Sequence, residues 1–399
     1  MAGAKNNLPT KVLVVDNDPA STKNVENILA KHDVSVMGAN NRENAIYLFN
    51  QNKFALVMLA MAIDDIPGTT LIQKWRNHET ESKRDTAYIV MTGQQVKSTD
   101  EQLIRELGDI FTIAKPFKEP VLLGILARAM QAFDNHAALS DVEKKVISPL
   151  LRQEKFDKAV ELARSTLEPK GVKGKQMAVC VYDQAKKYDM GLNLSTTLHQ
   201  EDEKNLRYVN DIGRFNMLLG NLDEATTWFE KADSLAPDNL MRLEDMAALY
   251  LAQQDPDKTV DKYREILRLN PEDKDRKFDM YERLQNAGFE QHARDFCKET
   301  STPMDLIRHF NNKGVIFAKK AEYEAAIAEY RKAEKLIPGN KELYRIMYNE
   351  ALAHINLKTK EHLEQAKELL EACLKIKPDY AKASEKLTLV EGYLDPKTA

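Results

Sequence analysis

Asp16 and Asp18 are the first residues whose types and spacing could support chemistry. They directly follow the apolar run Lys11–Val15, which predicts a buried parallel strand that delivers polar groups to the carboxyl edge of a sheet. Thr92 closes a later apolar run, and Lys115 follows another. In a doubly wound sheet, ligands bind at the carboxyl ends of the strands, so we expect any site in this part of the chain at that edge.

Metal, nucleotide and hydrolase chemistry lack the residues they need. The eight histidines are scattered, and His354 and His362 fall outside the i, i+4 spacing that places two ligands on one helix face. Cys180, Cys297 and Cys373 show no CxxC or Cys/His spacing, which indicates reduced thiols. The chain has no GxxxxGK[ST], Rossmann glycine fingerprint or GxSxG. We therefore predict no catalytic residue, no metal site and no cofactor.

The elements that position Asp16 alternate between strand and helix. After a helical pattern from Pro19 to Lys31, short apolar runs recur at 34–39, 55–59, 88–92 and 111–113, separated by segments with helical periodicity. Alternating strands and helices predict an α/β fold with a doubly wound parallel sheet of five strands.

Within this pattern, residues 1–133 resemble a response-regulator receiver domain, which implies the flavodoxin-like fold. The resemblance rests on landmark residues in the family's order. These are Asp16-Asn-Asp-Pro19 after the first strand, Leu56–Ala60 in the strand that normally ends in the phospho-accepting aspartate, Gly68 in the following turn, Ile89–Thr92 with the switch threonine, and Ala114-Lys-Pro-Phe117 with the pocket lysine.

A working receiver needs an aspartate nucleophile, further acids for Mg²⁺, and a Thr and a Lys for the phosphoryl oxygens. The resemblance places Ala60 at the nucleophile position and Asn17 where a second acid normally stands. It therefore implies a degenerate pocket that keeps Asp16, Thr92 and Lys115. We expect weak or absent metal binding, with Lys115 paired to Asp16 in a structural role.

Three alternatives stay open in this domain. Asp64 or Asp65 could replace the missing acceptor, although a loop aspartate would lie several ångströms from an in-line position and such residues are more often solvated turn residues. The remodelled pocket could instead sense a small ligand. Phe111, at the position of the family's switch aromatic, is equally well explained as a core side chain.

Residues 134–204 form a predicted helical connector with a partial repeat. The last receiver helix should run from Glu119 to about Phe133, and Ser140–Glu143 is typical of a capping box that opens another helix. The stretch 155–163 resembles the second helix of a tetratricopeptide (TPR) unit. Gly171 and its neighbours, residues 168–174, predict a loop, with helix resuming near residues 176–188. We expect two to four helices.

Residues 205–399 repeat small and aromatic residues at TPR spacings, which predicts an all-α TPR superhelix of about five units. Pro237 and Pro271 are 34 residues apart, the length of one repeat. Small residues should let paired helices approach closely, as expected at Gly213, Ala225, Gly314 and Ala326. The fifth unit should carry extra turn residues at 358–362, and residues 381–393 should form the capping helix.

First helices of TPR pairs line a groove that binds peptides or helices. Arg guanidinium groups bind carboxylates in bidentate fashion, so a mildly basic groove suggests an acidic peptide or acidic helix face as ligand. The alternative is that the groove residues are ordinary solvated charges. The family's groove positions select Arg207, Asn210, Arg214, Arg308, Asn311, Arg345 and Tyr348.

Composition narrows the function. The 58 Lys and Arg nearly balance the 62 Asp and Glu, with a pI near 6.1, so nucleic acid is not an expected partner. No stretch approaches the ~18 apolar residues of a membrane span. We predict a cytoplasmic, non-enzymatic scaffold in bacterial two-component signalling, with protein partners. A receiver-mediated dimer or docking contact and a phosphorylation-gated regulator remain alternatives.

Overall fold

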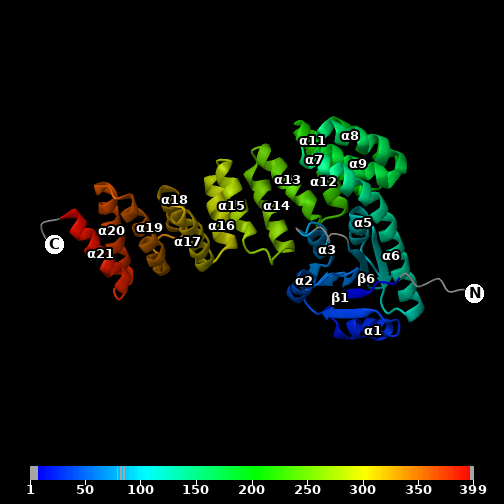
Figure 1. Ribbon diagram of the computed structural model, residues 1–399, viewed down its shortest axis with the longest axis horizontal. Helices are drawn as coiled ribbons and strands as arrows, with labels where there is room; N and C mark the ends of the chain where they lie inside the picture. Colours follow the sequence, from blue (N-terminus) through cyan, green and yellow to red (C-terminus); the bar gives the residue numbers. More distant parts are fainter. Residues whose placement is uncertain (1–7, 79, 81–82, 84–85, 396–399) are drawn as a thin grey trace, which may run out of the picture. The chain divides into compact units, whose positions relative to one another are not determined.

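The structure, a computed structural model, describes residues 8–395 except 79, 81, 82, 84 and 85 (Figure 1). Its contacts divide the chain into two compact units, Met1–Asp273 and Lys274–Ala399, and each is described by itself below. Within the described residues, every helix is too short or too polar to cross a bilayer. The boundaries at 133 and 204 stay predictions.

The first unit begins with the predicted five-stranded parallel sheet. Its order is β2-β1-β3-β6-β7, with all neighbours parallel. The chain leaves β1 for the edge and returns to the other side of β1, which places a topological switch point at the carboxyl ends of β1 and β3. The flavodoxin-like fold is confirmed. The strands are β1 Lys11–Val15, β2 Ser35–Ala39, β3 Leu56–Ala60, β6 Ala87–Thr92 and β7 Ile110–Ala114.

Two apolar layers cover the sheet. Helices α1 and α6 pack on one face, and α2 and α3 pack on the other, where Phe49 stacks on Trp75 at 4.4 Å. Asp18 caps α1 and Asn41 caps α2, so polar residues at the strand ends also start the helices. The helices are α1 Pro19–Ala30, α2 Arg42–Gln51, α3 Thr69–Arg76, α5 Ser98–Leu107 and α6 Glu119–Val142.

The predicted helix start at Ser140 is wrong. Helix α6 runs through to Val142 and continues as a π-helical turn, Glu143–Ile147, because extending a helix costs less than nucleating a new one. The Glu143 carboxylate accepts a hydrogen bond from the Ser148 hydroxyl at 2.5 Å, so it acts at the beginning of the next helix.

Four α-helices complete the connector, at the upper end of the prediction. The predicted loop is shorter than expected: a 3₁₀ turn at Glu168–Lys170 is followed by Gly171, whose φ of 78° reverses the chain, and helix resumes at once. The helices are α7 Ser148–Arg152, α8 Phe156–Leu162, α9 Val172–Gln184 and α10 Tyr188–Glu201, with a π-helical turn at Ala163–Leu167.

The remaining described residues, up to 395, form five helix pairs and a final helix, as predicted. The extra residues of the fifth pair do not enlarge its turn. Thr359 caps α20 by accepting from the backbone N–H of His362, so the helix starts early and is lengthened instead. The pairs are α11 Leu206–Leu219 with α12 Leu222–Leu235, α13 Leu240–Ala252 with α14 Pro256–Leu269, α15 Arg276–Asn286 with α16 Glu290–Thr300, α17 Pro303–Lys319 with α18 Tyr323–Leu336, and α19 Tyr344–Leu357 with α20 Lys360–Ile376; α21 is Ala381–Leu394.

Small residues allow the paired helices to approach, as the sequence predicts. A Cβ built on Gly314 would lie 2.3 Å from the Tyr330 ring, and one on Gly213 would lie 2.9 Å from the Phe229 ring. Aromatic side chains therefore occupy the volume that a larger residue would need.

Gly314→Ala tests this packing. The new methyl group would overlap the Tyr330 ring, so we expect the free energy of unfolding to fall by about 1 to 3 kcal/mol, measured by urea titration of the circular dichroism signal. Gly392→Ala is the matched control, because a Cβ there meets nothing within 4 Å. Equal stability of the two variants would contradict this role of Gly314.

Candidate functional sites: the receiver pocket and the repeat groove

The receiver pocket lies at the carboxyl ends of β1, β3 and β6. Lys115 Nζ lies 2.8 Å from Asp16 Oδ2, and the Asp16 side chain is only 5% exposed, so the expected pairing of these residues is confirmed. The other Asp16 oxygen accepts from the backbone N–H of Asp18 at 3.1 Å. Both oxygens of this carboxylate are thus engaged by the protein itself.

The end of β3 and the end of β6 lie beside each other. Ala60 pairs with Met91 in the parallel ladder and is buried. Thr92, next to Met91, is also buried, and its hydroxyl lies 3.5 Å from the carbonyl oxygen of Ile113 on β7. The structure therefore brings Ala60 and Thr92 to the sheet edge that the sequence predicted for them.

Asp64 is held in place by hydrogen bonds to both of its carboxylate oxygens. It lies in the turn of a short antiparallel hairpin, β4 Ala62–Ile63 with β5 Ile66–Pro67. One of its oxygens accepts from the Asn17 amide at 2.9 Å, and the other accepts from the backbone N–H of Arg42 at 2.7 Å. The Asn17 oxygen in turn accepts from the backbone N–H of Asp64 at 3.1 Å.

Asp65 is exposed, and it shares with Asp64 a positive φ, 61° and 54° respectively. Asp tolerates the left-handed region better than most residues. Gly68 holds the far end of this loop: its N–H donates to the carbonyl oxygen of Met61 at 2.7 Å, and a Cβ there would meet the Ala60 carbonyl at 2.2 Å. This loop is therefore fixed by backbone contacts on both sides.

Phe111 lies on β7 and is partly buried. It packs against the core layer under α6, and the Arg128 guanidinium lies 5.7 Å from its ring centre. It also lines a pocket of about 300 Å³ with Arg76 and Arg207. Its core role is thus compatible with the structure, and a switch role stays a prediction.

The second unit gathers four of the predicted groove residues in one pocket. Helices α17 and α19 supply them, and α21 and the residue before it add Tyr380 and Lys382. Tyr348 and Tyr380 meet edge to face at 5.2 Å, and the Asn349 amide donates to Asn311 at 2.7 Å. We call this the distal pocket; it measures about 410 Å³, and its lining includes Arg308, Asn311, Arg345, Tyr348, Tyr380 and Lys382.

Charge in the distal pocket has one sign. Arg308, Arg345 and Lys382 are exposed, and the described lining residues include no carboxylate. Arg345 lies 3.4 Å from Glu342 outside the pocket, an exposed pair that contributes little. The expected basic character is therefore present in this section of the groove.

The other three groove residues line a different cavity, of about 360 Å³, between α9, α11, α13 and the receiver helices α3 and α5. The sequence predicted a mildly basic groove, and for this proximal cavity that prediction is wrong. Four guanidinium and four carboxylate groups line it. The Arg214 guanidinium lies 3.1 Å from Asp183 and 3.0 Å from Asp245. Because these acids come from neighbouring helices, selecting Arg207 and Arg214 by groove position alone missed them.

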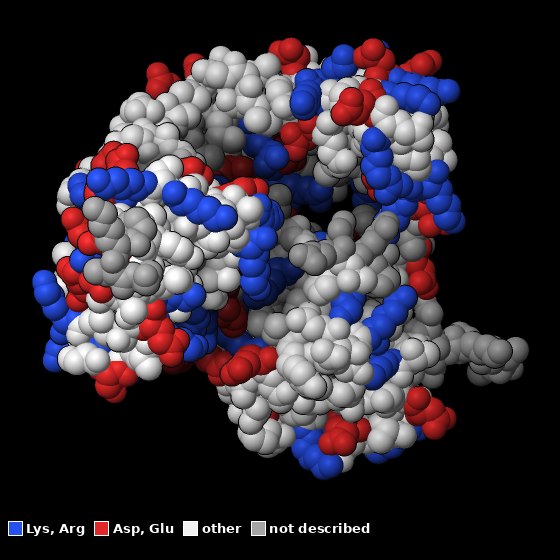
Figure 2. Space-filling model, turned by 60° about the vertical axis from the view of Figure 1, so that its left-hand side comes forward, with Lys and Arg blue, Asp and Glu red and all other residues white. Residues whose placement is uncertain are grey.

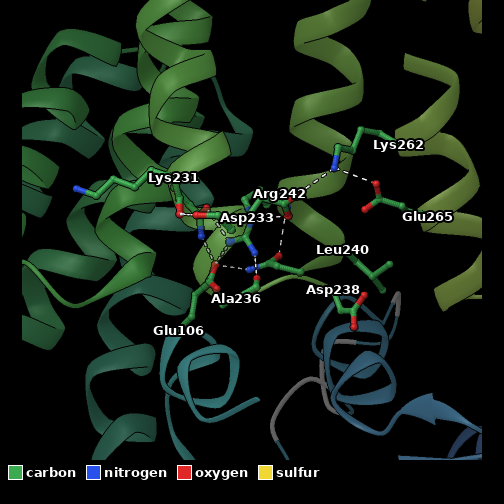
Figure 3. Close-up of polar contacts among 12 residues, drawn as sticks. Glu106, Lys231, Asp233, Ala236, Asp238, Leu240, Arg242, Lys262 and Glu265 are labelled. Carbon is green, nitrogen blue, oxygen red and sulfur yellow. Dashed lines mark hydrogen bonds and ion pairs between the residues drawn. The ribbon is translucent and has the colours of Figure 1, made fainter. Parts of the chain in front are cut away.

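Asn210 is already engaged. Its amide group donates to Glu106 of receiver helix α5, and its oxygen accepts from Arg242 of α13 at 3.1 Å. Arg242 also donates to Glu106 at 2.7 Å and to Asp233 at 3.2 Å, and Lys262 extends the network to Asp233 at 2.9 Å (Figure 3). The receiver thus contributes a carboxylate to the groove.

Glu106 and Arg242 are almost fully removed from solvent, with side chains 2% and 0% exposed. Burial raises the pKa of Glu106, while Arg242, Asn210 and Asn239 oppose that rise. A buried charge of this kind requires a paired and hydrogen-bonded partner, and the repeat helices supply it.

Sequence reasoning missed Glu106, Arg242 and Gln73. The Gln73 amide donates to the carbonyl oxygen of Asp238 at 3.1 Å, and its oxygen accepts from the N–H of Leu240 at 2.7 Å. The available signal was Glu106 itself, an acid between apolar residues on the inner side of a helix. His354 and His362 also meet, with their Nδ1 atoms 2.8 Å apart, although their spacing does not suggest it; in the described part of the chain no group of three metal-ligating residues forms.

Comparison with known families agrees with this geometry. Residues 12–127 match the response regulator receiver domain, and residues 206–239, 308–340 and 344–380 match the tetratricopeptide repeat. The chain therefore joins a response regulator receiver domain to an all-helical region with TPR repeats. No curated protein sequence matches it significantly.

Solved structures resemble parts of the chain. The chemotaxis response regulator CheY4 of Vibrio cholerae is 19% identical over 30% of this chain and 98% of its own, with a TM-score of 0.27. The adenylate cyclase structure from Rhodopirellula baltica is 21% identical over 35% of this chain and all of its own, with a TM-score of 0.31. The Cut9–Hcn1 hetero-tetramer of the APC/C is 15% identical over 66% of this chain and 52% of its own, with a TM-score of 0.31.

Asp211 gives the proximal cavity a pH dependence. Burial raises its pKa to about 6, from 3.8. Between these values the folded state binds more protons than the unfolded chain, so wild-type stability falls as pH rises. Asp211→Asn removes this titration. Between pH 4 and pH 7 the free energy of unfolding of the variant should therefore rise by about 1 to 3 kcal/mol relative to wild type.

Urea unfolding at several pH values in that range measures the difference. The exposed Glu203→Gln is the control, and its stability relative to wild type should not change with pH. A pH-independent difference for Asp211→Asn would contradict the effect of burial on Asp211.

Proposed function

We propose that this protein is a non-enzymatic signalling adaptor whose distal pocket binds an acidic segment of a partner protein. The observation that carries the proposal is the one-sided charge of that pocket, where three cations and two tyrosine rings line the surface and the described lining residues include no carboxylate. Guanidinium groups pair with carboxylates in a planar, bidentate geometry, and the rings offer apolar contact to the rest of a peptide.

The two signs of charge elsewhere on the chain support a protein partner rather than nucleic acid. On the face drawn in Figure 2, Lys and Arg lie among Asp and Glu, without the broad single-sign field that phosphate backbones require. We propose cytoplasmic signalling as the setting, as receiver and TPR domains suggest together.

Binding of an acidic peptide tests the distal pocket. Arg308→Ala and Arg345→Ala should each weaken binding of a fluorescent Glu-rich peptide about tenfold, since a hydrogen bond to a charged group contributes about 1.5 to 3 kcal/mol. Fluorescence anisotropy measures the dissociation constants. Lys360→Ala is the matched control: it removes the same charge from the same unit, on α20 and outside the pocket. Equal affinity of all three variants would overturn the proposal.

We also propose that the receiver acts without phosphorylation. Ala60 stands at the end of β3, and its methyl group can neither attack phosphorus nor coordinate Mg²⁺. Lys115, a phosphoryl-binding group in the family, is already paired with Asp16. A pocket with this donor set keeps one buried carboxylate, fewer than a Mg²⁺ ion bound by protein usually has around it.

Asp64 is the alternative acceptor, because it accepts a hydrogen bond from Asn17, the residue that directly follows Asp16. Both of its oxygens are hydrogen-bonded, however, and an in-line attack would require it to leave Asn17 and Arg42.

Incubation with acetyl phosphate and Mg²⁺ distinguishes the two cases. We expect no mass increase by intact-protein mass spectrometry, because no carboxylate is placed for attack. A stoichiometric adduct of one phosphoryl group that disappears in Asp64→Asn or Asp65→Asn would establish the phosphorylation-gated alternative.

A further inference from the structure

One face of α5 is part of the contact between the receiver and the first two repeats, to which Gln73 of α3 also contributes hydrogen bonds with Asp238 and Leu240. Leu103 and Leu107 of α5 pack against a cluster of repeat side chains, and Glu106 points toward Arg242 (Figure 3). The three side chains lie on one stripe of the helix, since positions i, i+3 and i+4 share a face. The repeat side of the cluster consists of Leu206, Val209, Trp228, Ala232 and Ala236.

Glu106 fits the groove as a ligand fits a site. A single oxygen, Oε1, accepts from the Arg242 guanidinium at 2.7 Å, from the Asn239 amide at 2.5 Å and from the Asn210 amide. These three donors come from α11 and from the start of α13, and all of them bind the same oxygen atom. Donors arranged in this way recognise a carboxylate specifically, because they would be left unpaired beside an apolar side chain.

The contact is less complete on the receiver side. Glu106 Oε2 is buried, and among the described residues it has no hydrogen-bond partner. Two ion pairs at the edge of the contact are about half exposed, Arg105 with Asp202 and Lys173 with Asp109. Exposed pairs of this kind contribute little to stability. Leu103, Glu106 and Leu107 are therefore the buried part of the contact that α5 makes with the repeats.

We propose that this section of the groove is a recognition site for an amphipathic helix that carries two leucines four residues apart and a glutamate directly before the second. Helix α5 of the chain's own receiver occupies the site, and a partner helix with the same pattern displaces it. This goes beyond the acidic-peptide binding proposed for the distal pocket, since it involves different residues and a different ligand.

The proposal is tested with full-length protein and a labelled peptide of residues 97–109. Glu106→Lys should release α5, because a second cation would face Arg242. The control is Glu101→Lys, with the same charge change on an exposed position of α5. Hydrogen exchange in residues 98–107 reports release, and fluorescence anisotropy reports peptide binding.

We expect faster exchange in Glu106→Lys alone, together with at least tenfold tighter peptide binding than wild type or Glu101→Lys shows. A peptide with Glu106→Gln should bind the Glu106→Lys protein at least ten times more weakly than the unaltered peptide. Adding Arg308→Ala to the Glu106→Lys protein should leave its affinity for the α5 peptide unchanged. The same substitution should weaken binding of the acidic peptide to the distal pocket.

Three results would overturn the proposal. Release of α5 without peptide binding would mean that the contact is interdomain packing only. Unchanged hydrogen exchange in Glu106→Lys would mean that Glu106 does not hold the helix. Loss of peptide binding on adding Arg308→Ala would place the peptide in the distal pocket instead.

Discussion

The buried ion pair between Glu106 and Arg242 is the constraint on which the arrangement of the first unit depends. Neither side chain has access to solvent, and taking two charges out of water is costly unless each finds its partner in the correct geometry. A displacement of α5 along the groove would leave a bare carboxylate opposite apolar side chains. The pair therefore fixes one register between receiver and repeats, while Leu103 and Leu107 supply apolar contact that would tolerate several registers.

Electrostatics distinguishes the proximal cavity of the first unit from the distal pocket of the second. In the proximal cavity, Arg214 is balanced by Asp183 and Asp245, and the acids are contributed by the same helices that line the cavity. In the distal pocket, Arg308, Arg345 and Lys382 have no acid among the described lining residues. In the proximal cavity, the charges of the repeat helices are thus paired within the chain. In the distal pocket, the repeat helices present net positive charge.

The fold was predictable from the sequence because its signals are local. The apolar runs predicted all five strands of the parallel sheet, though not the β4–β5 hairpin, and small residues such as Gly213 and Gly314 indicated the helix pairs. The pairing of Lys115 with Asp16 was also predicted, from the resemblance of these residues to the pocket of a receiver domain. Local patterns gave a wrong prediction at Ser140, because the helix continues through the residue that was expected to cap a new one. They could not reveal the ion pair of Glu106 with Arg242, since these residues are 136 positions apart in the sequence and a contact at that separation leaves no periodic pattern.

A single residue, Arg42, links the loop beside the receiver pocket to the repeat side of the first unit. Its backbone N–H binds Asp64 in the loop beside the receiver pocket, while its buried side chain pairs with Glu272 at 2.5 Å and with Thr70 at 3.0 Å. Glu272 follows α14, on the repeat side of the unit. A rearrangement of the Asp64 loop would therefore move the first turn of α2. Through the Arg42 side chain it would also move the contact with Glu272, so that one residue links the receiver pocket mechanically to the second repeat.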